Sequence, residues 1–133
     1  MAITFSVPGD PVPQPRPRIT VRGKRGHAYT PADHPIHAYR AAIAAAALAA
    51  GAGVHAEPVE VVIDFVFARP KSHMRKSGLK PKAPRLPLPD IDNLEKAVLD
   101  SLNGVAWHDD RQVARVVKEK SYGTEARTTV RIA

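Results

Sequence analysis

Alternation of hydrophobic and polar residues predicts two β-strands in the first half of the chain. Ile3, Phe5 and Val7 alternate with polar residues, which indicates a short strand near the amino terminus. A longer alternating run covers residues 59–67 and carries Asp64 on its polar face. Because neighbouring side chains of a strand point to opposite faces, each run presents one apolar face to a core.

Helical periodicity predicts two helices. Residues 35–50 are rich in alanine, the best helix former, and Gly51 follows as a stop. From Asn93 to Leu102, apolar residues recur at helical spacing, and Asn103-Gly104 favours a left-handed end. The sequence Asp92-Asn93-Leu94-Glu95 resembles a capping box, so we expect Asp92 to be the extended N-cap residue.

Two β-branched runs near the carboxyl end, residues 111–120 and 126–132, flank a Ser-Tyr-Gly-Thr turn and predict a terminal hairpin. The resulting order, β-α-β-α-β-β, predicts an α+β fold in which two helices pack on a mixed sheet. With 133 residues, 44% hydrophobic, the chain is expected to form a single domain over residues 1–133.

Proline interrupts this pattern in two places, residues 8–17 and 81–89. Proline cannot continue a helix or donate to a sheet, so both clusters are predicted to be irregular or extended. We therefore expect two long loops at about 8–27 and 69–88.

The two loops carry most of the positive charge of a basic protein. The formal net charge is +7 and the sequence pI is about 10.1, which favours nucleic acid as a partner. Two stretches without acidic residues hold the candidate DNA-binding cations: Arg16, Arg18, Arg22, Lys24, Arg25, Arg69, Lys71, Arg75, Lys76, Lys80, Lys82 and Arg85.

Two further observations narrow the class of protein. The chain has no cysteine, which excludes a disulfide scaffold, a thiolate zinc site and a cysteine nucleophile. Its first residues lack the pattern of a secretory signal or a membrane span, so we expect a cytoplasmic protein without membrane contact.

Residues 90–110 are acidic, in contrast to the basic loops, with six acidic residues against Lys96 alone. In an extended segment Asp90 and Asp92 would point to the same side, and Asp109 and Asp110 follow just before a strand. Carboxylates about 4 Å apart repel by roughly 4 kcal/mol per pair at an effective dielectric near 20, so a packed cluster needs a cation. Oxygen ligands indicate Mg²⁺, with Mn²⁺ as a substitute.

The spacing of these residues resembles the RusA-type Holliday junction resolvase family. The resemblance rests on the runs Asp90-Ile91-Asp92-Asn93-Leu94-Glu95-Lys96, Leu99-Asp100-Ser101-Leu102-Asn103-Gly104 and Trp107-His108-Asp109-Asp110-Arg111-Gln112-Val113, and on Lys118. It implies a Mg²⁺-dependent homodimeric endonuclease that makes paired, symmetric nicks in four-way DNA junctions during recombination and repair, in association with the nucleoid. The resemblance also assigns the catalytic residues, Asp90, Asp92, Asp110 and Lys96, and the metal ligands, Asp90, Asp92, Asp110 and Asp109.

Structural roles compete with these assignments. Asp92 alone is a helix cap, Asp109-Asp110 alone is a loop signal, and Lys96 can pair with Asp92 or Asp100. Asp64 points toward solvent or toward the acids. The alternative functions are a non-catalytic nucleic-acid-binding domain and a metal nuclease acting on other branched DNA or on RNA.

Overall fold

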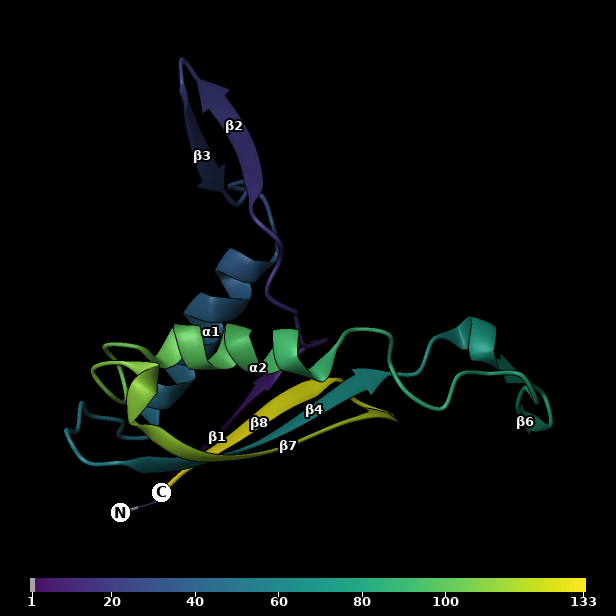
Figure 1. The fold of residues 1–133 in the computed structure, drawn as a ribbon. Helices are drawn as coiled ribbons and strands as arrows, with labels where there is room; N and C mark the ends of the chain where they lie inside the picture. Colours follow the sequence, from purple (N-terminus) through teal and green to yellow (C-terminus); the bar gives the residue numbers. More distant parts are fainter. Residues whose placement is uncertain (1) are drawn as a thin grey trace.

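A four-stranded mixed sheet supports the fold, in the strand order β1-β8-β4-β7 (Figure 1). The computed structural model describes residues 2–133, without the side chain of Arg22. The central strand β4 pairs with β7 in parallel and with β8 antiparallel, and β1 pairs with β8 antiparallel. The four strands are β1 (Ile3–Pro8), β4 (Val59–Ala68), β7 (Val113–Gly123) and β8 (Arg127–Ile132).

The predicted terminal hairpin is wrong, because β7 and β8 lie on opposite sides of β4. Two strand spacings are only about 10 Å, a distance that the short connection 124–126 spans easily. The reason lies in β4, which carries Val62 and Val66 in addition to its alternating apolar residues. A strand with apolar residues on both faces gains most from a central position, flanked by a strand on each side.

Two helices, α1 (Ile36–Ala49) and α2 (Ile91–Leu102), cover the same face of the sheet (Figure 1). They bury the apolar face of β4, including Val61, Ile63 and Phe65. Each such side chain contributes about 1.5–3 kcal/mol when it leaves water. The predicted α+β class, with two helices packed on a mixed sheet, is confirmed.

Helix α2 begins earlier than the sequence pattern predicts. Its N-cap residue is Asp90, with an extended backbone (φ −64°, ψ 133°), and Asp92 already lies in the first turn. The prediction of Asp92 as the extended N-cap is therefore wrong. Ile91 explains the shift, because it packs against the core three residues before buried Leu94 and extends the apolar stripe of the helix.

Two arms project from this body (Figure 1). The β2–β3 arm (residues 16–30) is a hairpin of β2 (Arg18–Arg22) and β3 (Arg25–Tyr29). The β5–β6 arm (residues 69–88) contains a 3₁₀ turn, η1 (Lys71–His73), and the short pair β5 (Met74–Arg75) and β6 (Gly78–Leu79). Residues 9–17 and 80–90 contain no helix or strand, as the proline clusters predict, but these two strand pairs interrupt the loops expected at about 8–27 and 69–88. Within residues 2–133, neither helix has the length and apolar character needed to cross a membrane.

Candidate active site

The outward face of α2 carries a row of charged side chains. Asp92, Lys96 and Asp100 follow one another at intervals of four residues, which places them on one side of the helix. Asp92 and Asp100 are two turns apart, about 12 Å along the helix axis. The row therefore has an amino-terminal end near Asp92 and a carboxyl-terminal end near Asp100.

At the amino-terminal end, Asp92 is paired with a lysine from the neighbouring strand. Lys118 on β7 donates to Asp92 Oδ1 at 2.7 Å and to Glu95 Oε2 at 3.3 Å. The hydrogen bond from Lys118, together with its charge, lowers the pKa of Asp92 below its ordinary value. Asp92 is thus held ionised in an exposed position, with the Lys118 ammonium on its Oδ1.

In the middle of the row, Lys96 pairs with Asp100 at 3.5 Å and not with Asp92. Asp100 also faces Arg40 of α1 at 3.5 Å, and Arg40 donates to the side chain of Gln14. Of the two pairings that the sequence allowed for Lys96, the structure has the one with Asp100, which through Arg40 also joins α2 to α1 and to the segment that leads to the β2–β3 arm.

Asp109 and Asp110 approach the carboxyl-terminal end of the row from the 3₁₀ turn η2 (Asp110–Gln112). Asp109 caps this turn and accepts from the backbone N–H of Arg111 at 2.9 Å, which lowers the pKa of Asp109. Partial desolvation, followed by the proximity of Asp109 and Asp100, raises the pKa of Asp110, and nearby Lys96 opposes the rise. Asp110 is therefore a carboxyl group crowded by others.

A buried anchor fixes this turn. Trp107 is fully buried, and its indole N–H donates to Asn103 Oδ1 at 2.8 Å. The side chain of Gln112 accepts from the backbone N–H of His108 at 2.8 Å and donates to the carbonyl of His55 at 2.6 Å. Sequence reasoning gave Gln112 no role, although its place in the capping box with Asp109 was visible as the spacing Asp-x-x-Gln.

The candidate metal ligands do not form one cluster in this structure. Across residues 2–133, no three carboxylate or histidine side chains lie close enough to hold a metal ion together. Asp90 is exposed, and its side chain does not cap the helix that it begins. The donor chemistry fits a hard divalent cation, because every candidate is a carboxylate and Asp110 is already crowded by two others.

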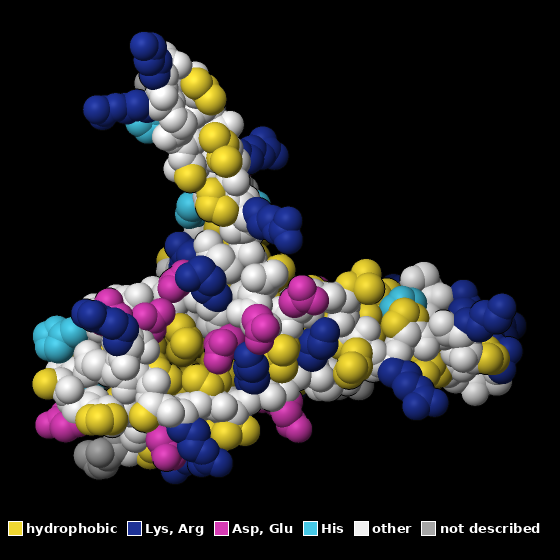
Figure 2. Space-filling model, in the orientation of Figure 1, with side chains coloured by type: hydrophobic (Ala, Val, Ile, Leu, Met, Phe, Trp, Pro, Cys, Tyr) yellow, Lys and Arg dark blue, Asp and Glu magenta, His cyan; other side chains and the backbone are white. Residues whose placement is uncertain are grey.

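The candidate DNA-binding cations extend over both arms, while the acids lie on the body between them (Figure 2). Most are exposed, namely Arg16, Arg18, Lys24, Arg25, Lys71, Arg75, Lys76, Lys80, Lys82 and Arg85. Arg69 differs, since its guanidinium stacks 4.0 Å from the ring centre of Tyr122 and donates to the carbonyl of Pro84. The side chain of Arg22 lies outside the described residues.

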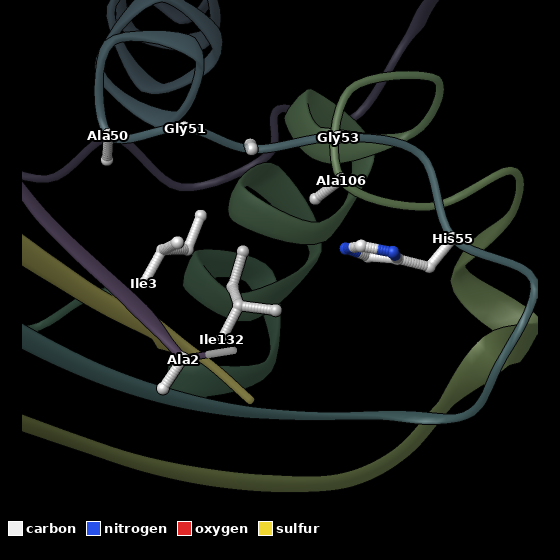
Figure 3. Close-up of a pocket in the computed structure, with 9 residues that line it drawn as sticks. Ala2, Ile3, Ala50, Gly51, Gly53, His55, Ala106 and Ile132 are labelled. Carbon is white, nitrogen blue, oxygen red and sulfur yellow. The ribbon is translucent and has the colours of Figure 1, made fainter.

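Two other features stand apart from the acids on α2. Asp64 points away from the helices and pairs with Arg127 of β8 at 3.9 Å. A cavity of about 420 Å³ is lined mostly by small and apolar residues, and His55 is the one titratable side chain among its described lining residues (Figure 3). Neither feature contributes a carboxylate to the row on α2.

Comparison with known proteins gave two matches. The model of the family described as "Endodeoxyribonuclease RusA" matches residues 8–133. The chain is also 33% identical, over 135 residues, to the "Uncharacterized protein YqaN" of Bacillus subtilis (strain 168). That match covers 98% of this chain and 94% of the Bacillus protein. The family match includes every candidate site residue on α2, on η2 and in the arms.

Proposed function

This chain belongs to the RusA endodeoxyribonuclease family, and from that premise we propose that it resolves four-way DNA junctions by paired, symmetric nicks. The observation that carries the proposal is the position of an acidic face between two basic arms (Figure 2). Cations on two separate projections can hold the phosphates of diverging duplexes while the acids face the branch.

Within this proposal, Asp90, Asp92, Asp109 and Asp110 supply carboxylate ligands to Mg²⁺, for which Mn²⁺ can substitute. When bound, such an ion lowers the pKa of a water molecule and neutralises charge that develops on the phosphate. Lys96 lies close enough to Asp110 to influence its pKa and keeps 61% of its side chain exposed. Because Asp100 also pairs with Arg40, the Lys96 ammonium is available to stabilise the transition state.

The proposal includes a homodimer. A four-way junction has approximate two-fold symmetry, and its resolution requires nicks in two opposed strands. Two copies related by a two-fold axis present two equivalent acidic faces. Sedimentation equilibrium at micromolar concentration should therefore give twice the chain mass of 14.4 kDa; a monomer that still nicks junctions at paired positions would contradict this part.

The setting that we propose is recombination and repair of DNA in the cytoplasm, in association with the nucleoid. The strong positive charge supports this setting, because a basic protein accumulates on DNA at physiological ionic strength.

A cleavage assay tests the proposed function. Labelled four-way junction, matched duplex, single-stranded DNA and branched RNA are each incubated with Mg²⁺ or with EDTA. We expect symmetric nicks in the junction, sealed by DNA ligase, only in the Mg²⁺ reactions. Binding to all substrates without cleavage would favour a non-catalytic binding domain, and cleavage of the branched RNA at an equal rate would favour a broader metal nuclease.

A further inference from the structure

Lys118 lies beneath the first turn of α2, and the pairing of its strand fixes its position there. Lys118 lies opposite Ile63 in the parallel pairing of β4 with β7, and only 23% of its side chain is exposed. Its neighbours Val117 and Glu119 are exposed and point to the other face of the sheet. Strand pairing therefore directs the Lys118 side chain toward α2.

The Lys118 ammonium has two carboxylate partners with different surroundings. Glu95 is partly enclosed, with 24% of its side chain exposed, whereas Asp92 is 86% exposed. Glu95 can therefore keep the ammonium in place when Asp92 turns away toward solvent. Lys118 occupies Asp92 Oδ1, so a divalent cation that binds this oxygen has to take the place of the ammonium.

We infer, on the basis of the proposed function, that Lys118 is the resident counter-cation of Asp92 and that a divalent cation binds Asp92 by displacing the Lys118 ammonium. Lys118 is then a positioning residue. It orients Asp92 and screens it from Glu95 before metal arrives, and it competes with the metal for the same oxygen. The released ammonium stays beside Glu95.

Lys118 could compete with the metal or only support Asp92, and these two roles predict opposite changes in metal affinity when Lys118 is removed. If Lys118 only supported Asp92, its loss would misplace the carboxylate and weaken metal binding. If Lys118 competes with the metal, its loss frees the carboxylate and strengthens binding. Loss of an exposed ion pair such as Lys118–Asp92 should therefore raise the metal affinity about threefold, given the free energies typical of such pairs.

The test is a Mn²⁺ titration of the full chain without DNA, followed by electron paramagnetic resonance or calorimetry. Lys118→Met and Lys118→Gln remove the charge, and Lys118→Arg retains it. We expect tighter Mn²⁺ binding in Lys118→Met and Lys118→Gln, wild-type binding in Lys118→Arg, and a larger Mn²⁺-induced rise in melting temperature for the uncharged variants. Unchanged or weaker Mn²⁺ binding in a folded uncharged variant would overturn the inference.

Lys120 provides the matched control on the same strand and the same face. Its ammonium donates to the carbonyls of Pro87 and Pro89 at 2.9 and 2.8 Å, and so it anchors backbone and no carboxylate. Lys120→Met should leave Mn²⁺ affinity within about twofold of wild type. An increase equal to that in Lys118→Met would show that net charge alone explains the effect, and would contradict the inference.

Asp92→Asn separates this inference from the proposed function. Unchanged Mn²⁺ binding in Asp92→Asn would contradict the metal site itself, and with it the role of Lys118. Weaker binding in Asp92→Asn, combined with unchanged binding in Lys118→Met, would contradict the inference alone and leave the proposed function intact.

Discussion

The hydroxyl groups of Tyr39 on α1 and Thr128 on β8 lie 2.6 Å apart in the core. Thr128 is completely buried and Tyr39 is 7% exposed, so each hydroxyl depends on the other for its hydrogen bond. Burial raises the pKa of Tyr39 to about 12, although the hydrogen bond with Thr128 opposes the rise. This contact ties α1 to an inner strand of the sheet.

Removing one hydroxyl of this pair should destabilise the protein. In Tyr39→Phe the Thr128 hydroxyl loses its partner, and a buried unpaired polar group costs about 1–3 kcal/mol. The double variant Tyr39→Phe/Thr128→Val should recover much of that loss in urea unfolding, because neither polar group remains. Additive losses in the double variant would contradict this coupling.

The raised pKa of Tyr39 also predicts a dependence of stability on alkaline pH. The folded protein keeps this proton up to about pH 12, while the unfolded chain releases it near the ordinary value of 10.0. The free energy of unfolding should therefore fall as pH rises from 10 toward 12. Because lysines titrate in the same range, the measurement is the difference between wild type and Tyr39→Phe, which should shrink over this interval.

Variants of the three aspartates that we propose as catalytic should differ in stability, although the proposal requires all three for nicking. Single changes of Asp90, Asp92 and Asp110 to Asn should abolish cleavage while junction binding persists or tightens, because each change removes a negative charge facing phosphate. Since the pKa of Asp110 is raised, its ionisation costs stability, and Asp110→Asn should raise the melting temperature. Asp92→Asn should lower it, because the pairing with Lys118 is lost.

Cleavage and calorimetry on the same preparations check this prediction. Junction binding that falls in parallel with cleavage would assign these residues a structural role. Equal melting temperatures for Asp92→Asn and Asp110→Asn would contradict the different environments of the two carboxylates.

The β5–β6 arm should contribute to affinity and not to the chemical step. We expect replacement of Arg75, Lys76, Lys80 and Lys82 with Gln to remove three or four phosphate contacts and so to flatten the slope of log K against log salt by roughly three units. Single-turnover nicking at saturating protein should change little. The control replaces Arg115 and Arg131, exposed cations on the sheet, and should leave the slope unchanged. If only the control changes the slope, DNA contacts the sheet instead of the arm.

Gly123 should resist substitution because of a close approach within the sheet. A Cβ atom at this position would lie 2.7 Å from Val66 Cγ1. Gly123→Ala should therefore cost about 1–3 kcal/mol of folding free energy, as overpacked cores do, and Val66→Ala should relieve part of that cost. Gly53→Ala is the matched control, since nothing lies within 4 Å of its Cβ position. Equal unfolding free energies for the two variants would contradict the contact.

The local residue pattern predicted which segments form helices and strands better than it predicted which strands lie next to each other. Alternation identified β1 and β4, and helical spacing identified α1 and α2, because these periods follow directly from burial of one face. Strand order failed at β7 and β8, since it depends on which strand gains most from a central place. The N-cap was misplaced because the packing of Ile91 extended the helix.

The site was predicted unevenly for the same reason. The acidic residues were visible as a local excess of charge, and Lys118 was visible only as part of a motif. Its contact with Asp92 joins residues far apart in the sequence, through the parallel pairing of β4 with β7. The contact of Arg40 with Asp100 likewise depends on how the two helices pack.

The order of strands constrains when the sheet can assemble during synthesis of the chain. Among the described strands, β1 is hydrogen-bonded in the sheet to β8 alone, and β8 is the last strand in chain order. Strand β1 therefore stays unpaired on the ribosome until β8 (Arg127–Ile132) has emerged, and such distant pairing is slow to form. Asp92 on α2 likewise lacks its partner Lys118 until β7 has emerged. The basic arms, residues 16–30 and 69–88, precede β7 and β8 in the chain, so they leave the ribosome before the sheet that supports them is complete.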